Sequence, residues 1–436
     1  MKAIIIPSKN KNSAEIKIPA SKSLLHRDLI CASLSKGTSY IYNVTMNDDV
    51  IATIGCLRNL GVSIEIEENT LKVNSSGKLK LEDNHFYPKE SGSTLRFLIP
   101  IVGSLNEGGY FHLEGKLGKR PLDDYQKIFT ENNAEFTYIN NDLLYVKGPI
   151  RNREYHLKGN ITSQYISGLL MASPLYDEEI RIIIDKPIES KPYIDLTIGE
   201  LAKFGAEIET IENSKEVIYL KKKNQIYTKQ NVTVEGDYSQ AAFFLALGMI
   251  NDTIALNNMP ENSLQGDAKI IQFLNELGGK IEFSDNKLIS WQANGDNDKN
   301  VLLDIKDTPD LGPILMAIAA IKPIETKLVN THRLIYKESN RSFAMQTELT
   351  KIGSIVKVFD NEIIIDGISL ENRSYQKEIV FDSHNDHRIV MSLAIIATKL
   401  MFCEKIIINN VEAINKSYPN FFNDLQKVGI KVTLEE

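Results

Sequence analysis

Two segments of this 436-residue chain place a lysine or arginine beside small hydroxyl residues or glycine, immediately before a helical pattern. The first contains Lys22, Ser23 and Arg27, and the second surrounds Gly92 and ends at Arg96. A helix amino terminus has unpaired amide groups and a partial positive charge, so it attracts anions, and a nearby cation adds to that attraction. Either segment alone also fits an ordinary capped helix with solvated charges, which is the commoner case.

Seven more segments along the rest of the chain place charged or hydroxyl residues at or near the start of a predicted helix, and five of them contain a lysine or arginine. They are Lys119 to Pro121, Ile161 to Tyr165, Glu189 to Asp195, Asp307 to Leu311, Tyr336 to Arg341, Asn385 to Arg388, and Lys416 before Ser417-Tyr418-Pro419. Pro121 suits the first position of a helix, which would place Arg120 at a helix start. Lys337 and Arg341 are four residues apart, so we expect them on one helical face.

Taken together, these segments predict more than any one of them does. If the helix starts point inward, two domains would present facing cationic surfaces. Such surfaces suit two small polyanions, because arginine binds phosphate and carboxylate through two hydrogen bonds at once. Asp310 and Glu338 are carboxylates within these basic segments and are therefore candidates to carry protons. The residues alone predict an enzyme that acts on two anionic substrates and closes between domains.

An internal repeat supplies the elements that must position these residues. An apolar helical segment followed by a turn residue and a short alternating strand recurs six times, with the turn residue at Gly61, Asn133, Gly205, Gly278, Gly353 and Gly429. The successive spacings are 72, 72, 73, 75 and 76 residues. Such even spacing indicates repeated α/β units, and two domains of three units each suit the length. We expect the boundary between the third and fourth units to fall between Val232 and Gly236.

Composition limits the class of protein. The net charge of −7 does not favour nucleic-acid binding, which usually requires a basic surface. Cys31, Cys56 and Cys403 fit no disulfide framework or metal spacing, so we expect reduced cysteines in a cytoplasmic protein. No apolar stretch has the length of a signal-peptide core or of a membrane span.

The motifs together resemble those of the EPSP synthases, a family of enolpyruvyl transferases. The matching segments come in the family's order and at matching intervals, and they are Ser21-Lys22-Ser23 with Arg27, Lys119-Arg120-Pro121, Ser163-Gln164, Ser190 to Asp195, Gly236-Asp237, Gln265-Gly266-Asp267, Lys337-Glu338-Ser339 with Arg341, and Asp386-His387-Arg388. The resemblance implies two inverted α/β barrel domains, each of three βαβαββ repeats, joined by a two-strand hinge. It implies a discontinuous domain of residues 1–18 and 234–436, an inserted domain of residues 19–233, and an active site in the cleft between them.

The same resemblance implies transfer of the enolpyruvyl group of phosphoenolpyruvate to the 5-hydroxyl of shikimate 3-phosphate, in the shikimate pathway that leads to chorismate and the aromatic amino acids. Asp310 would remove the hydroxyl proton as the oxygen attacks C2 of phosphoenolpyruvate. Glu338, with Lys22 nearby, would protonate C3, and loss of phosphate from the tetrahedral intermediate would follow. The resemblance further implies a monomer without metal or organic cofactor, no nucleic-acid or membrane partner, and glyphosate as the usual inhibitor of the family.

The resemblance also assigns residues to the two substrates. The residues expected to bind shikimate 3-phosphate are Lys22, Ser23, Arg27, Thr162, Ser163, Gln164, Ser190, Tyr193, Asp310 and Lys337. The residues expected to bind phosphoenolpyruvate are Lys22, Gly92, Arg120, Gln164, Arg341, Arg388 and Lys416.

Three positions depart from the family pattern. Glu90 stands where asparagine is usual, Arg333 where asparagine is common, and Asn340 where aspartate is usual. A carboxylate beside bound phosphoenolpyruvate would repel it, so we expect Glu90 to pair with a neighbouring lysine or arginine.

Two alternatives stay open from the sequence. The enolpyruvyl transferases that act on UDP-N-acetylglucosamine share the fold and the phosphoenolpyruvate chemistry, but they usually carry a reactive cysteine in a loop that corresponds to Gly115–Arg120, and this segment has none. A catalytically inactive binding protein of the same fold is expected to lack Lys22, Asp310, Glu338 or Arg341, and all four are present.

Overall fold

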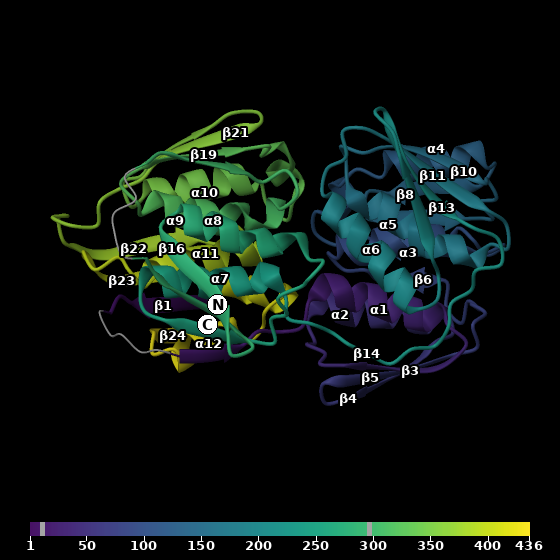
Figure 1. Cartoon of the computed structure of the whole chain (residues 1–436), viewed down its shortest axis with the longest axis horizontal. Helices are drawn as coiled ribbons and strands as arrows, with labels where there is room; N and C mark the ends of the chain where they lie inside the picture. Colours follow the sequence, from purple (N-terminus) through teal and green to yellow (C-terminus); the bar gives the residue numbers. More distant parts are fainter. Residues whose placement is uncertain (9–13, 294–298) are drawn as a thin grey trace. The chain divides into compact units, whose positions relative to one another are not determined.

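The computed structural model describes residues 1–8, 14–293 and 299–436, and it contains six similar α/β units that match the predicted repeats (Figure 1). The five junction glycines have φ angles between 83° and 90°, and Asn133 has a φ of 53°. This left-handed conformation ends each helix and turns the backbone into the following strand, and glycine and asparagine tolerate it best. The repeat prediction is therefore confirmed at the backbone level.

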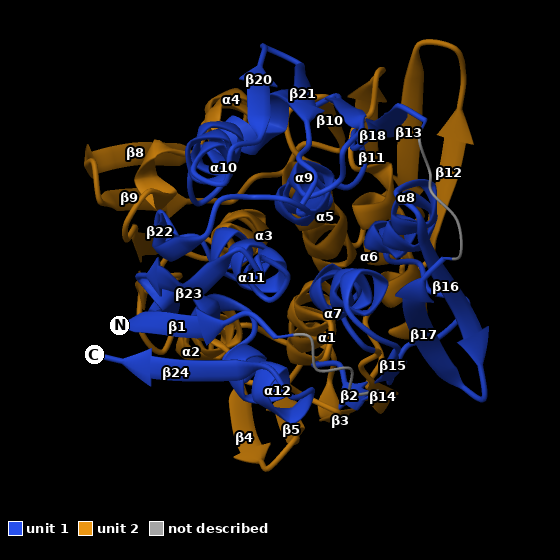
Figure 2. Ribbon diagram, turned by 90° about the vertical axis from the view of Figure 1, so that its left-hand side faces the viewer, with its two compact units in different colours: residues 1–19, 236–436 blue, residues 20–235 orange. Residues whose placement is uncertain are grey.

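The chain divides into two compact units (Figure 2). Unit 1 contains Met1–Pro19 and Gly236–Glu436, and unit 2 contains Ala20–Glu235. Each unit has its own hydrophobic core of buried aliphatic and aromatic side chains. Each unit is therefore described by itself below.

Unit 2 contains the first three repeats. The elements of the first repeat are β14 (Val232–Thr233), α1 (Lys22–Leu34), β3 (Gly37–Tyr42), α2 (Asp48–Asn59), β4 (Ser63–Glu67) and β5 (Thr70–Ser75). Those of the second are β6 (His85–Phe86), α3 (Gly92–Val102), β7 (Gly108–His112), α4 (Asp123–Glu131), β8 (Glu135–Asn140) and β9 (Leu143–Lys147). Those of the third are β10 (Glu154–Lys158), α5 (Ser163–Ala172), β11 (Ile180–Asp185), α6 (Lys191–Lys203), β12 (Ile208–Glu212) and β13 (Glu216–Lys221).

Unit 1 contains the other three repeats. The elements of the fourth are β2 (Ala14–Lys17), α7 (Tyr238–Ile250), β15 (Ile254–Asn257), α8 (Ile270–Glu276), β16 (Gly279–Ser284) and β17 (Lys287–Gln292). Those of the fifth are β18 (Val301–Asp304), α9 (Gly312–Ala320), β19 (Glu325–Val329), α10 (Arg341–Thr350), β20 (Ile355–Val358) and β21 (Glu362–Asp366). Those of the sixth are β22 (Gln376–Asp382), α11 (His387–Ala397), β23 (Cys403–Asn409), α12 (Phe421–Lys427), β24 (Lys431–Glu435) and β1 (Lys2–Ile6). Short 3-10 helices occur at Leu117–Lys119, Ser173–Leu175, Gly266–Lys269, Pro309–Leu311, His332–Tyr336 and Val411–Lys416.

Each repeat forms one four-stranded sheet, and the six sheets share one pattern of strand order. In the second repeat, for example, β6 runs parallel to β7, and β9 then pairs antiparallel with both β7 and β8. Three sheets take one strand from a distant part of the chain. β14 completes the sheet of the first repeat, β2 completes that of the fourth, and β1 lies between β23 and β24 in that of the sixth (Figure 2).

The helices occupy the inside of each unit and the sheets the outside. Every residue of α7, α9 and α11 is buried, and these three helices contact one another in unit 1. A helix that is buried all round belongs in a protein interior. Strands such as β9, β17 and β21 alternate between buried and half-buried residues, so each sheet covers the helices with one face. This arrangement is the inverted α/β barrel that the resemblance implied.

Two composition-based expectations can be compared with the structure. The three cysteines are free thiols and are buried, as predicted. Across the described ranges, the chain has no helix of sufficient length and apolar character to cross a membrane.

Candidate active site

Most of the predicted site residues lie at or beside helix starts, as their sequence context predicted. Ser91 and Thr162 cap their helices by accepting hydrogen bonds from the backbone amides of Thr94 and Gln164. The helices that begin at or next to a predicted site residue are α1 (Lys22), α3 (Gly92), α5 (Ser163), α6 (after Ser190), α10 (Arg341) and α11 (before Arg388). The amino termini of these helices, with their partial positive charge, therefore lie beside basic side chains.

Arg341 is the centre of a charged cluster in unit 1. Its side chain is 1% exposed, and its guanidinium donates hydrogen bonds to three carboxylates. The distances are 2.8 Å from Nη1 to Asp310, 2.8 Å from Nη2 to Glu338 and 2.8 Å from Nε to Asp386. The hydroxyl of Ser339 also donates to Asp386 at 3.0 Å. Because arginine offers its donors in a rigid planar fork, this side chain fixes the three carboxylates relative to one another.

Three further cations complete this cluster. Lys337 lies 3.0 Å from one oxygen of Asp310, and Arg388 lies 3.2 Å from the other. Lys416 lies 3.7 Å from Glu338. With Arg341, four cations face the three carboxylates, so the seven side chains carry a net positive charge when all are ionised. Within unit 1 the structure brings Asp310, Lys337, Glu338, Arg341, Arg388 and Lys416 together.

The surrounding cations control the charge of Asp310. Burial alone would raise the pKa of this carboxyl, but Arg388, Lys337 and Arg341 together hold its pKa well below the ordinary value. Asp310 is therefore ionised at neutral pH in the ligand-free protein. Anions that bound these cations would weaken their hold on Asp310 and so raise its pKa, which would make it a better base.

Asp267 is a further carboxyl beside this cluster. It is 2% exposed and accepts a hydrogen bond from the hydroxyl of Ser239, whose carbonyl in turn accepts from Arg388. Burial, together with the negative charge of Asp310, raises the pKa of Asp267 from its ordinary value of 3.8 to about 6, against the opposing effect of Arg388. Asp267 is thus a group whose charge changes at mildly acidic pH.

We expect an Asp267→Asn variant to change how stability depends on pH. A carboxyl whose pKa is raised by folding contributes stability below its unfolded pKa, and this contribution is lost as the pH rises through its folded value. The variant has no carboxyl group at this position, so it does not lose this stability as the pH rises. Its free energy of unfolding, compared with that of wild type, should therefore increase by roughly 2 kcal/mol between pH 4.5 and pH 7. Urea unfolding followed by circular dichroism at several pH values measures this. A constant difference between the two proteins at every pH would contradict the assignment.

A second cluster, in unit 2, surrounds Gly92 at the start of α3. A Cβ atom at this glycine would lie 2.7 Å from Arg120, 3.3 Å from Arg96 and 3.5 Å from Gln164, so three polar side chains converge on its backbone. Arg96 donates to Gln164 at 2.6 Å, and Gln164 donates to the hydroxyl of Ser93 at 3.0 Å. Two guanidinium groups beside a helix amino terminus form an arrangement that suits an anion.

Arg27 is a buried cation on α1. It is 3% exposed, and its guanidinium donates to neutral oxygen atoms of Thr197 (2.8 Å), Ser23 (2.6 Å), Tyr193 (3.0 Å) and Ser167 (3.4 Å). Burial lowers the pKa of Arg27 to about 10, although the nearby Glu200 acts in the opposite direction. Arg27 therefore stays charged at neutral pH, and its close partners orient the guanidinium without neutralising it.

The other predicted residues of unit 2 lie on or beside the starts of α1, α5 and α6. Lys22 forms an ion pair of 2.8 Å with Asp49 on α2. Ser190 precedes α6 with a φ of 53°, and its carbonyl accepts the backbone amide of Tyr193 at 3.0 Å. Ser163, the first residue of α5, is 5% exposed.

Two expectations about local structure are wrong. Lys337 and Arg341 do not share a helical face, because Asn340 caps α10 and Lys337 precedes it in an extended conformation. Arg120 is not at a helix start, because it follows a 3-10 turn and α4 begins only at Asp123. Both side chains nevertheless reach the predicted clusters, Lys337 through Asp310 and Arg120 beside Gly92.

The structure also places the three residues that depart from the family pattern. The carboxylate of Glu90 lies against Gly115, in the loop that leads to Arg120. Asn340 accepts a hydrogen bond from the amide of Phe343 as the cap of α10, a role that asparagine and aspartate fill equally well. Arg333 lies close enough to Lys337 to lower the pKa of that lysine further, beyond the larger effect of burial.

Three residues of the two clusters were not assigned a role from the sequence. Arg96 and Asp386 stand inside the motifs, so a search for charged residues one turn from a helix start could have found them. Asp49 offers no such signal, because it is separated from Lys22 by a whole strand and looks like an acid that stabilises the start of α2. Only the packing of α1 against α2 reveals the pair.

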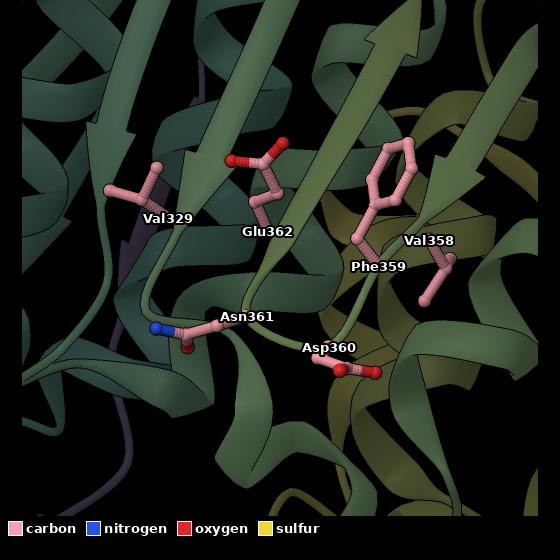
Figure 3. A pocket seen from close by; sticks show the side chains of 6 residues that line it. All are labelled: Val329, Val358, Phe359, Asp360, Asn361 and Glu362. Carbon is pink, nitrogen blue, oxygen red and sulfur yellow. The ribbon is translucent and has the colours of Figure 1, made fainter.

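A separate hollow of about 620 Å³ lies at the turn between β20 and β21 (Figure 3). Its charged lining residues, Asp360 and Glu362, are both acidic, and Phe359 and Val358 provide its apolar side. An acidic hollow does not suit an anionic substrate. In residues 1–8, 14–293 and 299–436, the structure has no group of three or more His, Cys, Asp or Glu side chains arranged to hold a metal ion.

Comparison with known proteins identifies the family. A family model described as EPSP synthase (3-phosphoshikimate 1-carboxyvinyltransferase) matches residues 7–425. The chain belongs to the EPSP synthase family. Within this family it is 40% identical over 440 residues to the 3-phosphoshikimate 1-carboxyvinyltransferase of Clostridioides difficile (strain 630), which covers 98% of this chain and 97% of the relative. It is 41% identical over 435 residues to the enzyme of that name from Clostridium novyi (strain NT), with the same coverage.

Solved structures support the fold assignment of this EPSP synthase family member. The EPSP synthase of Acinetobacter baumannii matches with a TM-score of 0.79 at 21% identity, over 99% of this chain and all of that one. The enolpyruvyl transferase NikO from Streptomyces tendae matches with a TM-score of 0.77 at 14% identity, over 99% of this chain and 98% of that one. At these identities the likeness establishes the fold alone.

Proposed function

We propose that this protein transfers the enolpyruvyl group of phosphoenolpyruvate to the 5-hydroxyl of shikimate 3-phosphate, which gives 5-enolpyruvylshikimate 3-phosphate and inorganic phosphate. Family membership and about 40% identity to proteins named 3-phosphoshikimate 1-carboxyvinyltransferase over nearly the whole chain support this function. The single structural observation that carries it is the cluster around Arg341, where two carboxylates able to move protons lie among four cations. The protein is an enzyme of the shikimate pathway, and we propose that it works in the cytoplasm.

The cluster in unit 1 fits the chemistry of addition followed by elimination. In the addition step, Asp310 accepts the proton of the 5-hydroxyl while its oxygen bonds to C2 of phosphoenolpyruvate, and Glu338 gives a proton to C3. In the elimination step, C3 returns a proton to Glu338, the bond from C2 to the phosphate oxygen breaks, and the double bond forms again, while the proton held by Asp310 leaves with the phosphate. Lys337, Arg388 and Lys416 stabilise the negative charge that accumulates between the two steps.

We propose that the residues of both units share the two substrates. Phosphoenolpyruvate contacts the cluster around Gly92 and the cations of unit 1, through Lys22, Gly92, Arg120, Gln164, Arg341, Arg388 and Lys416. Shikimate 3-phosphate contacts the residues around Arg27 and the Asp310 region, through Lys22, Ser23, Arg27, Thr162, Ser163, Gln164, Ser190, Tyr193, Asp310 and Lys337. The oriented, charged guanidinium of Arg27 and the two guanidinium groups beside Gly92 support this division.

Phosphate release from phosphoenolpyruvate tests the proposed function. We expect release when shikimate 3-phosphate is the acceptor, and none above background when UDP-N-acetylglucosamine replaces it. Release with the nucleotide sugar alone would assign the chain to the other type of enolpyruvyl transferase. Release with neither acceptor would favour an inactive binding protein of the same fold.

A further inference from the structure

One position of the repeat is buried in all six copies but differs in chemistry. It lies five residues before the junction residue, and its occupants are Cys56, Ile128, Glu200, Phe273, Glu348 and Asp424. A buried carboxylate costs free energy unless it is paired and hydrogen-bonded. Because apolar side chains fill the same place in three sister repeats, the fold itself does not require an acid there. The three acids therefore call for a separate explanation.

Each of the three acids forms an ion pair with a lysine of its own helix. A lysine follows three residues later, and the ion pairs are Lys203–Glu200 (2.8 Å), Lys351–Glu348 (2.7 Å) and Lys427–Asp424 (2.7 Å). These lysines are partly exposed, whereas the acids are buried. An exposed ion pair contributes little to stability, so the lysines compensate the charge of the acids without explaining their presence.

The second partner of Glu348 is the loop between β22 and α11. Its carboxylate, which is 1% exposed, accepts the amide of Asp382 at 2.9 Å and lies 3.1 Å from Nε2 of His384. His384 and the next residue, Asn385, have φ angles of 52° and 56°. Two consecutive residues in the left-handed region are costly, so this loop needs support from its surroundings.

The loop held by Glu348 leads directly to two residues of the cluster. Asp386 and Arg388 follow it, and Asp386 is bound by Arg341, the first residue of α10. Glu348 lies further along the same helix. Helix α10 therefore contacts the loop between β22 and α11 at two points, through Arg341 and through Glu348. The position of Arg388 depends on both contacts.

Asp424 has a similar second partner. Its carboxylate accepts the hydroxyl of Tyr418 at 2.8 Å, and Tyr418 is 1% exposed. Tyr418 follows Lys416 by two residues, and its amide is bound to the carbonyl of Ile414 at 2.8 Å. The bond from the Tyr418 hydroxyl to Asp424 joins the segment that carries Lys416 to α12.

Glu200 repeats the relation in unit 2. It is 2% exposed, and its carboxyl group shares a hydrogen bond with Asp28, the residue next to Arg27 on α1. Burial and the proximity of Glu200 raise the pKa of Asp28 well above its ordinary value. The charged groups that face this pair are Arg27 on α1 and Lys203 on α6.

We infer that Glu200, Glu348 and Asp424 are positioning residues that use one equivalent place in three repeats to fix the segments carrying Arg27, Arg388 and Lys416. The inference rests on the proposed function, because it assigns these three cations to the substrates. Glu348 carries it furthest, since two contacts with the adjacent loop are defined. In each case the acid acts through a neighbouring segment and does not itself touch a substrate.

The test compares Glu348→Gln with Lys351→Met, which removes the ion pair but leaves the carboxylate facing Asp382 and His384. The carboxylate of Glu348 faces three donors, which are the amide of Asp382, the imidazole of His384 and the ammonium of Lys351. A glutamine cannot accept hydrogen bonds from all three, because its amide nitrogen must face one of them. We expect Glu348→Gln to raise the KM for phosphoenolpyruvate about tenfold and to change the KM for shikimate 3-phosphate less than twofold. Lys351→Met should change neither KM. Tyr418→Phe should raise the KM for phosphoenolpyruvate in the same way through Lys416, without a change to the acid itself.

Hydrogen exchange of the ligand-free protein tests the same inference without any assay of activity. Amides of residues 382–388 should exchange faster in Glu348→Gln than in wild type or Lys351→Met. Unchanged exchange there, or faster exchange without the split between the two KM values, would overturn the inference. If the wild-type protein released no phosphate from phosphoenolpyruvate and shikimate 3-phosphate, the proposed function would fail first, and the exchange result would still decide whether Glu348 holds the loop.

Discussion

Glu338→Gln is expected to lower turnover by about 10²- to 10⁴-fold, the usual contribution of a general acid or base. Glutamine matches the shape of glutamate and can still accept a hydrogen bond from Arg341, so the contact with Arg341 is kept while the weaker one with Lys416, at 3.7 Å, is lost. It cannot donate a proton to carbon, which is the step assigned to this residue. The KM values for both substrates should therefore change much less than kcat.

Deuterium uptake makes this prediction specific to the proposed proton donor. In deuterated water the wild-type protein should place deuterium on C3 of the enolpyruvyl group during turnover, and Glu338→Gln should lose this uptake together with phosphate release. The matched control is Glu325→Gln on β19, an exposed carboxylate of the same unit. Turnover of the Glu338 variant within a few-fold of wild type would remove Glu338 from the mechanism.

Arg341→Met is expected to have the largest effect on stability. The methionine leaves Asp310, Glu338 and Asp386 without the guanidinium that each of them contacts at 2.8 Å. Removal of one partner from a buried ionic group typically costs about 3–5 kcal/mol, because the remaining charges stay buried. Urea unfolding at pH 7 measures this loss, and turnover should fall with it.

The pH dependence of Arg341→Met distinguishes lost charge pairing from lost packing. In wild type the pKa values of Asp310 and Asp386 lie below the ordinary value, against the opposing effect of burial. A lowered pKa contributes stability that is present above the unfolded pKa and disappears as the pH falls through the folded value. The variant lacks much of that contribution, so its deficit should be nearly constant from pH 7 down to the ordinary carboxyl pKa of 3.8 and should shrink as the pH falls below that value. A deficit that is the same at pH 5 and at pH 3 would indicate a packing effect alone.

The repeats and the helix starts could be predicted because local rules determine them. A glycine or asparagine is required where φ is positive, and hydroxyl or acidic residues cap helices wherever they occur. Lys337 was misplaced because the helix begins only after the cap at Asn340, which leaves Lys337 outside it. The sequence could not reveal the pairing of Lys22 with Asp49, because it arises when two helices of one repeat pack against each other.

Long-range strand pairing was the other part that local patterns could not supply. β2 and β14 are short, and each completes a sheet whose other strands lie elsewhere in the sequence. Their residues alternate like those of any edge strand, so periodicity cannot identify the partner. Family resemblance, and not periodicity, gave the expectation that the first strand belongs with the carboxy-terminal half.

The place of β1 between β23 and β24 also imposes an order on biosynthesis. β1 is translated long before β23 and β24, so neither of its neighbours exists until the last repeat has been translated. Unit 2 is continuous in sequence, and the amide of Ser21 is bound to the carbonyl of Glu235 at 2.8 Å, so its ends meet and it can fold while translation continues. Until β23 and β24 have been translated, the apolar strand Lys2–Ile6 has no strand to pair with. An unpaired apolar strand can pair with other chains, so β1 is a site of aggregation risk during synthesis.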